Sequence, residues 1–244
     1  MPPSTAARRR PSPQLRQRAE RIAAQLACDY ADATCALRHA SPLELLLATI
    51  LSAQCTDDRV NRVTPALFAR FPTAAALAAA PPGAIETLIR SCGFFNAKAR
   101  NLRGCCRALV ERHGGEVPRT MDELVRLPGV ARKTANVVLG TAFGIAVGVV
   151  VDTHVQRITR LLGLTRQRTP ERIEQDLMAL LPPDAWIDFS HRLIWHGRRV
   201  CSARRPRCDD CSLAALCPSA RQPAARPAAQ SAGRAVGRSR KSAR

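Results

Sequence analysis

Aromatic residues, strand-like patterns and long hydrophobic runs are all scarce in this 244-residue sequence. Aromatics make up 4% of the chain, and β-branched residues seldom alternate with polar ones, which disfavours an all-β sandwich or barrel. The longest apolar stretch, residues 135–151, spans 17 residues and includes three glycines, whereas a bilayer-spanning helix needs about 20 apolar residues. We therefore predict a buried helix that ends near Gly144, and no membrane partner.

Lysine and acidic residues are also scarce relative to arginine. The chain has 35 Arg against three Lys, and its 38 basic residues outnumber 19 acidic ones to give a net charge of +19. Residues 1–18 and 218–244 contain no acid and together carry +12, so residues 19–217 still carry +7. A folded body that stays basic without its ends favours a polyanionic partner, most simply nucleic acid. A genome-wide preference for Arg codons is the alternative explanation.

No apolar segment follows the Pro- and Arg-rich start, so we expect no secretory signal and a reducing, cytoplasmic location. In that compartment ten cysteines indicate free thiols or metal ligands rather than a disulfide framework. Six of them lie scattered among Ala and Leu, where cysteine behaves as a small hydrophobe: Cys28, Cys35, Cys55, Cys92, Cys105 and Cys106. The other four crowd into 17 residues and predict a metal site.

Helix signals recur between the two ends of the chain. Ser41-Pro42-Leu43-Glu44 and Thr120-Met121-Asp122-Glu123 are capping boxes, and Thr169-Pro170-Glu171 starts a third well-marked helix. Apolar residues at helical spacing predict further helices near 15–29, 58–70, 84–91, 96–112, 132–143, 153–162 and 185–197. The predicted fold class is all-α. Segments 1–13 and 218–244 lack the apolar residues to form a core, so we expect two disordered basic tails.

The clustered cysteines follow the spacing Cys-x6-Cys-x2-Cys-x5-Cys. They are Cys201, Cys208, Cys211 and Cys217. Four thiolates on short loops hold either one zinc ion or one [4Fe–4S] cluster. Structural zinc sites usually have two Cys-x2-Cys pairs, whereas this sequence has one, with unequally spaced outer cysteines. The asymmetry favours one [4Fe–4S] cluster, with zinc as the alternative. Between the first two cysteines lie three arginines that form either a solvated loop or a phosphate-contacting one: Arg204, Arg205 and Arg207.

A Pro-Gly turn at residues 128–129 separates two predicted helices, the second of which begins within four residues. Such a turn exposes backbone N–H groups beside a helix N-terminus, which suits a phosphate. Lys133 stands at the start of the second helix in a chain that otherwise uses arginine. An amine forms a Schiff base, whereas a guanidinium does not. A solvated lysine at a helix start is the plainer interpretation.

Asp152 ends the apolar run 149–151 and precedes a predicted helix, so it is well placed as an N-cap. A carboxylate in that position could also face a cleft and act on a developing cation or a proton. For His154, two residues further on, we favour a structural role at the helix start over catalysis.

These motifs together resemble the endonuclease III family of DNA glycosylases. Residues 127–135 (Leu-Pro-Gly-Val-Ala-Arg-Lys-Thr-Ala) look like its helix-hairpin-helix, and residues 151–154 (Val-Asp-Thr-His) look like its catalytic-aspartate segment. The four-cysteine spacing is similar to its cluster loop, and residues 51–54 and 93–98 resemble its two DNA-facing loops. The similarity runs in order from about residue 15 to residue 217.

The resemblance implies two helical domains that flank a DNA-binding cleft. A six-helix domain with the hairpin would span residues 36–147, and a cluster domain would combine residues 14–35 and 148–217. Lys133 would be the nucleophile and Asp152 its carboxylate partner. Gln54 would fill the space left by the extruded nucleotide, opposite an apolar wedge at Phe94. The implied DNA contacts are Gln54, Phe94, Gly129, Val130, Ala131, Arg132, Thr134, Arg204, Arg205 and Arg207.

Three positions depart from the family pattern. Ala131 replaces the usual second hairpin glycine, so its backbone must suit an L-residue or bear strain. Phe94 is larger than the usual aliphatic wedge, and Cys55 stands where alanine is usual. The details of the wedge are therefore less firmly implied than the catalytic pair.

The implied activity is base excision repair. The enzyme would flip an oxidised pyrimidine out of duplex DNA, remove it, and cleave the abasic site by β-elimination through a lysine Schiff base. Its partner would be double-stranded DNA that contains oxidised pyrimidines or abasic sites, it would act as a monomer, and it would associate with the nucleoid. Two alternatives stay open: a monofunctional adenine DNA glycosylase, which would lack the lysine, and a non-enzymatic cluster-bearing DNA-binding protein.

Overall fold

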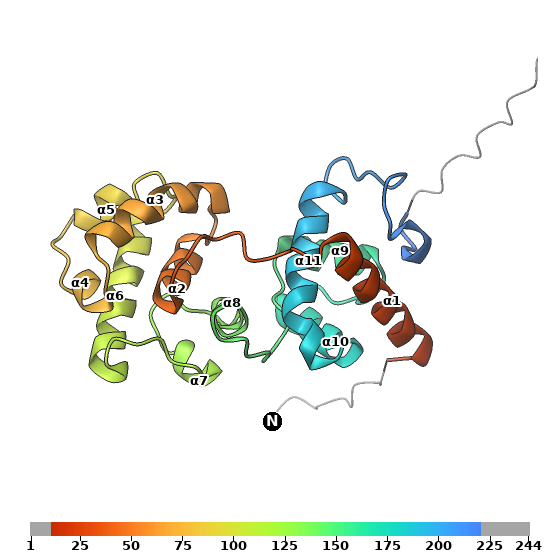
Figure 1. Ribbon diagram of the computed structural model, residues 1–244, viewed down its shortest axis with the longest axis horizontal. Coiled ribbons are helices and arrows are strands. Elements are labelled where there is room, and N and C mark those ends of the chain that lie inside the picture. The colour runs from red at the N-terminus through yellow and green to blue at the C-terminus, as the bar shows by residue number, and fades with distance from the viewer. Residues whose placement is uncertain (1–10, 221–244) are drawn as a thin grey trace, which may run out of the picture.

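The computed structural model describes residues 11–220, so most of the two predicted tails, residues 1–10 and 221–244, lie outside the described residues. Residues 11–220 form helices and no strand, which confirms the predicted all-α class. Figure 1 shows two helical lobes side by side, and the chain crosses between them near residues 30–41 and again near 144–152. No described helix combines the length and hydrophobicity that crossing a membrane requires.

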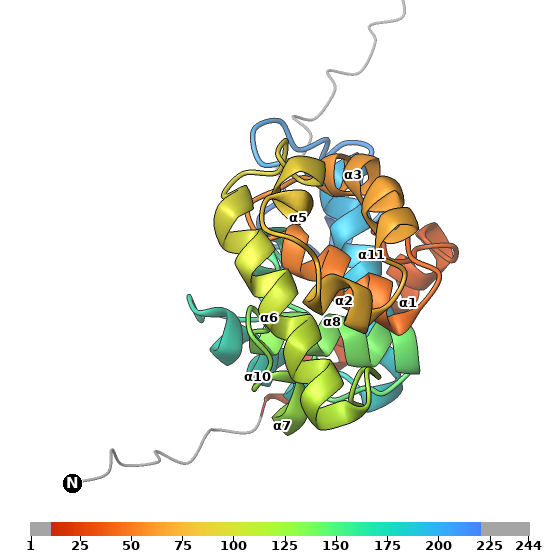
Figure 2. The ribbon, with the colours of Figure 1, turned by 90° about the vertical axis from the view of Figure 1, so that its left-hand side faces the viewer.

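The first lobe is built around α2, whose residues 45–51 are all buried, and which packs against α3, α6 and α8. Figure 2 looks onto this lobe and shows α6 running along it in front of α2 and α8. Its helices are α2 (Pro42–Leu51), α3 (Asp57–Arg70), α4 (Ala74–Ala78), α5 (Ala84–Leu88), α6 (Phe95–His113), α7 (Met121–Leu124) and α8 (Arg132–Phe143). One continuous hydrophobic core extends from Leu37 to Leu139.

The second lobe joins the start of the chain to its last third around a separate hydrophobic core, which extends from Ala19 to Leu213. Its elements are α1 (Pro13–Asp29), α9 (Thr153–Leu161), α10 (Pro170–Leu180), α11 (Trp186–Arg199) and the 3-10 turns η1 (Pro183–Ala185) and η2 (Ala214–Leu216). The guanidinium of Arg18 in α1 donates to the carbonyls of Leu162, Gly163 and Leu216 at 2.7, 3.0 and 3.2 Å. These three hydrogen bonds hold α1 against the end of α9 and against the segment that contains the four clustered cysteines, residues 201–217 (the cysteine segment).

Local capping explains where several helices begin. Ser41 Oγ accepts from the Glu44 N–H at 3.2 Å, and Glu44 Oε2 accepts from the Ala40 N–H at 2.6 Å, which confirms the first capping box. Thr120 caps α7 in the same way, with 3.4 Å from its Oγ1 to the backbone nitrogen of Glu123. Helix α4 was not predicted, because its sequence is alanine apart from Leu77 and shows no apolar periodicity.

The ordered part of the chain extends further at both ends than the expected tails allow. Ser12 caps α1 by accepting from the Leu15 N–H at 3.2 Å, and Pro13 is the first helical residue. At the other end, the Ala220 N–H donates to the Cys217 carbonyl at 3.1 Å. The expected tail boundaries at residues 13 and 218 are therefore wrong by one or more residues, because a helix cap and a turn order the chain there.

Candidate active site

The Pro-Gly turn before α8 is a tight β-turn that requires its glycine. The Val130 N–H donates to the Leu127 carbonyl at 3.1 Å, and Gly129 has a φ of +78° in the left-handed region. A Cβ built on Gly129 would lie 2.9 Å from Cβ of Asn101 in α6. Both conformation and space therefore exclude a side chain, and the turn backbone is left uncovered in front of α8.

The residues after the turn present backbone rather than side chains. Ala131 has φ −89° and ψ 168°, an extended conformation that any L-residue adopts, so the missing hairpin glycine causes no strain. No side chain caps α8, which leaves its first N–H groups without intrahelical partners. The side chains of Val130 and Thr134 are buried, so these two residues can reach a ligand only through their backbone. Lys133, in the first turn of α8, is exposed.

A buried carboxylate holds the start of α8. Glu174 of α10 is 5% exposed and accepts from Nε and Nη2 of Arg132 at 2.9 and 3.0 Å, and from Nδ2 of Asn136 at 2.8 Å. The hydrogen bonds that Arg132 donates to Glu174 raise the pKa of the arginine. A Cβ on Gly148 would lie 1.9 Å from Glu174 Oε1, so a glycine is needed for the carboxylate to fit. The Arg132 guanidinium, which the sequence suggested as a DNA contact, is thus engaged inside the protein.

Glu174 is a site residue that was not predicted, although its sequence position carries a signal. Its position three residues before Leu177 puts a glutamate on the apolar face of α10, where a charge needs a buried partner. Nothing in the sequence identified that partner as Arg132, which lies 42 residues earlier and in the other lobe.

Asp152 is the N-cap of α9. Its Oδ1 accepts from the Val155 N–H at 2.8 Å, which confirms the expected capping role. Its side chain is half-buried, and its other carboxylate oxygen makes no hydrogen bond within residues 11–220. Nearby His154 packs against α11: a Cβ on Gly197 would lie 2.6 Å from His154 Nδ1. This packing supports the structural role that the sequence favoured for the histidine.

Gln54 and Phe94 lie in two strained turns that touch. They are the only non-glycine residues with positive φ in the described chain, at +51° and +57°. A Cβ on Gly93 would lie 3.8 Å from the Gln54 carbonyl oxygen, so the turns are in contact. Both side chains are exposed, and Phe94 is 70% exposed, the most of any large hydrophobic residue between residues 11 and 220. An exposed aromatic on a strained turn is typical of a binding surface.

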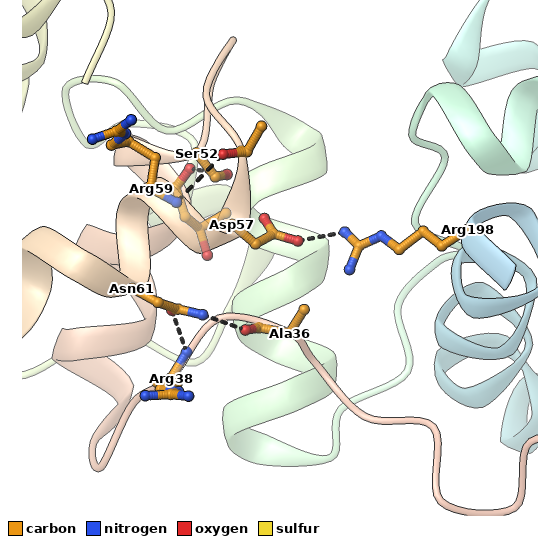
Figure 3. Close-up of polar contacts among 9 residues, drawn as sticks. Ala36, Arg38, Ser52, Asp57, Arg59, Asn61 and Arg198 are labelled. Carbon is orange, nitrogen blue, oxygen red and sulfur yellow. Dashed lines mark hydrogen bonds and ion pairs between the residues drawn. The ribbon is translucent and has the colours of Figure 1, made fainter. Parts of the chain in front are cut away.

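The Gln54 turn is also anchored to the second lobe. Figure 3 shows Asp57, in the first turn of α3, forming an ion pair with Arg198 of α11. In the same view, Asn61 of α3 accepts from the Arg38 N–H at 2.9 Å and donates to the Ala36 carbonyl at 2.8 Å. These contacts fix α3 to the segment that crosses between the lobes, and no local sequence pattern indicates them.

All four clustered cysteines line one cavity, together with apolar residues of α9 and η2. All four are free thiols. Burial, followed by the charges of the neighbouring cysteines, raises the pKa of Cys211 and of Cys217, as expected where sulfurs face a common space. Within residues 11–220, no three His, Cys, Asp or Glu side chains converge closely enough to hold a single ion. Four sulfurs that line one cavity are a donor set that suits a [4Fe–4S] cluster.

Polar groups reach the sulfurs from outside the cavity. Arg157 Nη1 donates to the Cys201 sulfur at 3.6 Å, and His196 Nε2 lies 3.7 Å from the Cys211 sulfur. His196 Nδ1 is in turn 3.0 Å from the Tyr30 hydroxyl, so α1 supports the cysteine segment through this histidine. Partners of this kind fix ligand orientation in metal sites.

The loop between the first two cysteines has two free arginines and one that is used internally. Arg204 and Arg205 are exposed, and Ser202 Oγ orders the loop by donating to the Arg205 carbonyl at 2.6 Å. Arg207 instead donates to the Arg199 carbonyl at the end of α11. The first two remain available to an anionic ligand, whereas Arg207 shapes the loop.

The tight hairpin before α8, in an all-α molecule with two cores, defines a helix-hairpin-helix protein of the DNA glycosylase type. The sequence profile of the HhH-GPD superfamily of base excision DNA repair proteins matches residues 47–183. The chain belongs to the endonuclease III family within that superfamily. Membership makes it a DNA glycosylase and abasic-site lyase of base excision repair.

Three relatives illustrate the similarity. Endonuclease III of Synechocystis is 58% identical over 205 residues, which cover 84% of this chain and 94% of the relative. Endonuclease III of Escherichia coli is 43% identical over 184 residues, covering 75% and 87%. The solved structure of a non-covalent endonuclease III–DNA complex matches with a TM-score of 0.80 at 43% identity and covers 84% of this chain and 96% of that one.

Proposed function

We propose that this enzyme removes oxidised pyrimidines from duplex DNA and cleaves the abasic site with Lys133 as nucleophile. One observation carries the assignment of the nucleophile. The described chain has two lysines, and Lys98 is buried with its Nζ inaccessible, whereas Lys133 is exposed on the first turn of α8 behind the hairpin turn. Glu174 holds the first turn of α8 and thereby fixes the backbone position from which the Lys133 side chain extends.

The reaction follows from amine chemistry. The unprotonated Lys133 amine attacks C1′, the bond from C1′ to the base breaks, and the base leaves with a proton. Opening of the sugar gives an iminium that acidifies the C2′ proton. Loss of this proton breaks the C3′–O bond, which cuts the strand on the 3′ side, and water then releases the lysine. Asp152, with one oxygen committed to the helix cap, would use the other to stabilise positive charge on the sugar and to move protons.

The DNA contacts divide by the atoms that each residue leaves accessible. Gly129, Val130, Ala131 and Thr134 would bind phosphate through backbone N–H groups, and Arg204 and Arg205 through guanidinium groups. Gln54 and Phe94, on touching turns, would enter the duplex where the flipped nucleotide leaves it. A related solved structure is a trapped endonuclease III–DNA covalent intermediate, at TM-score 0.80 and 43% identity, and it supports the covalent route.

Cys201, Cys208, Cys211 and Cys217 would hold one [4Fe–4S] cluster. When bound, the cluster would contribute rigidity to the cysteine segment rather than a step of the reaction. The residues 202–207 loop would then present Arg204 and Arg205 to the DNA backbone. We further propose that the enzyme works as a monomer on nucleoid DNA.

Borohydride trapping on duplex DNA with one abasic site tests the proposal. Wild-type enzyme should form a covalent complex, Lys133→Gln and Lys133→Arg should not, and Lys98→Met should trap like wild type. Trapping by Lys133→Gln would mean that another amine attacks. A trapping-negative wild type that still excises adenine opposite a mismatched base would favour the monofunctional adenine glycosylase. Lesion binding with neither activity would favour the non-enzymatic protein.

A further inference from the structure

Two cysteines that the repair reaction does not use flank the strained turns of the first lobe. Cys55 directly follows Gln54, and Cys92 lies two residues before Phe94. Cys55 is half-buried, whereas Cys92 is 1% exposed, and both belong to the same hydrophobic cluster. The close approach of the two turns at Gly93 brings Cys55 and Cys92 near each other although 37 positions separate them in the sequence.

The surroundings of Cys92 include the Cys55 thiol. Burial, then the charge of Cys55 and a hydrogen bond between the two thiols, raises the pKa of Cys92 to about 11. Lys98 and Arg59 act in the opposite sense, so two cations face this pair. The raised pKa keeps Cys92 protonated, so the half-buried Cys55 is the thiol of the pair that an oxidant can reach first.

Lys98 is the second observation. It is 3% exposed, its Nζ is buried, and the ammonium has no hydrogen-bond partner within the described residues. Burying an ammonium without a partner costs free energy, because its lost hydration is not replaced. A nearby anion would compensate that cost. A thiolate at the cysteine pair would supply that anion.

We propose that Cys55 and Cys92 form an oxidation-sensitive dithiol that closes to a disulfide and fastens the two turns together. The oxidant is a peroxide, the chemical class that oxidises thiolates by two electrons. The half-buried Cys55 thiolate attacks one peroxide oxygen, which breaks the O–O bond and gives a sulfenic acid and hydroxide. The Cys92 sulfur then attacks the sulfenic sulfur, forms the S–S bond and releases the oxygen as water. Two thiols lose two electrons, and one peroxide becomes two waters.

The disulfide would restrain the two turns that carry Gln54 and Phe94. Its effect on DNA binding rests on the proposed function, in which these side chains enter the duplex. A disulfide requires Cα atoms about 4.4–6.8 Å apart, so it fixes the separation of the turns that carry Gln54 and Phe94. The bond would hold these turns in the conformation that they have without DNA. Entry of the two side chains into a duplex would then be impeded until a thiol reductant reopens the bond.

Peptide mapping tests the disulfide independently of activity. Cluster-loaded protein is treated with hydrogen peroxide at equal concentration, with the visible absorption of the cluster as a check on its integrity, and then alkylated and cut with trypsin. Cleavage after Arg and Lys gives peptide 39–59 with Cys55 and peptide 91–98 with Cys92, each with a single cysteine. We expect these two peptides joined, lighter by two hydrogens than their sum, and separated by dithiothreitol.

Three variants provide the controls. Cys92→Ala should leave Cys55 as a sulfenic acid or a mixed disulfide with no joined peptide, and Cys28→Ser, which removes an exposed thiol elsewhere, should crosslink like wild type. Arg59→Gln, at an exposed residue, and Lys98→Met should each slow crosslinking, about tenfold for the buried lysine. Free Cys55 and Cys92 in oxidised protein, or Cys55 joined to any other cysteine, would overturn the proposal.

Binding to a duplex with a non-cleavable abasic analogue tests the consequence. Oxidised wild type should bind several-fold more weakly than reduced wild type, and Cys92→Ala should show no such difference. A crosslinked protein that binds with unchanged affinity would overturn the fastening of the turns. If the reduced enzyme bound no lesion duplex at all, the proposed function would fail while the peptide map still decided the disulfide.

Discussion

Arg132, Glu174 and Asn136 form one hydrogen-bonded group, and we expect the loss of its arginine and the loss of its glutamate to destabilise the protein to different extents. Glu174 is 6% exposed at its side chain, whereas the Arg132 side chain is 46% exposed. In Glu174→Gln, the arginine left behind can turn to water. In Arg132→Gln, the carboxylate left behind stays buried with Asn136 as its one remaining donor. Arg132→Gln should therefore destabilise the protein more than Glu174→Gln, although it changes the more exposed residue.

The loss in free energy of unfolding depends on how deeply the remaining, unpaired charge is buried in each variant. Stranding a buried carboxylate costs about 3–4 kcal/mol, because its desolvation is no longer compensated. Losing charge-assisted hydrogen bonds to a half-exposed arginine costs about 1.5–2.5 kcal/mol. At about 2–4 °C per kcal/mol for a chain of this size, Arg132→Gln should lower Tm by about 6–16 °C and Glu174→Gln by about 3–10 °C. Because each variant removes the same pair, the double variant should cost less than their sum.

Thermal unfolding followed by circular dichroism measures all three variants under one set of conditions. The matched control is Asp188→Asn, which removes an exposed ion pair to Arg192 at 2.8 Å one turn along α11 and should lower Tm by no more than about 2 °C. Borohydride trapping should also slow in both network variants, since the helix that carries Lys133 loses its anchor. If Glu174→Gln proved the costlier single change, or if either variant matched Asp188→Asn, the argument from burial would be refuted.

Three further perturbations separate conformation, protonation and catalysis. Gly129→Ala adds a Cβ 2.9 Å from a neighbouring side chain at φ +78° and should lower the free energy of unfolding by about 2–4 kcal/mol. Gly144→Ala, at φ +66° with no atom within 4 Å of the added Cβ, should lower it by about 1–2 kcal/mol. Urea unfolding measures both, and equal losses would contradict the role of space. Burial lowers the pKa of His191, so the unfolded chain binds the proton more readily and stability should fall as pH drops through about 6.5; a His191→Gln variant should lose less stability between pH 7 and 5. Asp152→Asn keeps the cap on the Val155 N–H, so Tm should hold while single-turnover excision falls by about 100-fold; a lower Tm would make the loss structural.

Elements with local signals were predictable from the sequence. The Ser41 and Thr120 capping boxes and the Asp152 cap describe contacts within four residues, so sequence and structure carry the same information. The hairpin turn was predictable for the same reason, because Gly129 follows a proline and the turn closes within four residues. Helix α4 lacked such a signal, since an alanine helix has no apolar face to detect.

The environment of the candidate site depends on contacts that no local pattern encodes. Arg132 looked like a DNA contact because it stands at a hairpin in a basic chain, and the carboxylate that engages it comes from another lobe. Val130 and Thr134 fitted the same pattern, yet their side chains fill the core. The residue types of Val130 and Thr134 did not reveal that their side chains are buried, and that of Arg132 did not reveal its partner, because both depend on the fold.

The cysteines show the same limit most clearly. All six scattered thiols had identical local descriptions, and that description suits Cys105 and Cys106, where burial raises the pKa of each to about 12. Cys55 and Cys92 differ because two turns approach each other at Gly93 and because the charge of the buried Lys98 acts on Cys92. Burying a lysine without a partner costs free energy, and the sequence of its own helix does not explain that cost. The neighbouring thiols provide the proposed partner. Chemistry that depends on pairs distant in sequence therefore becomes visible only when the packing of the first lobe is known.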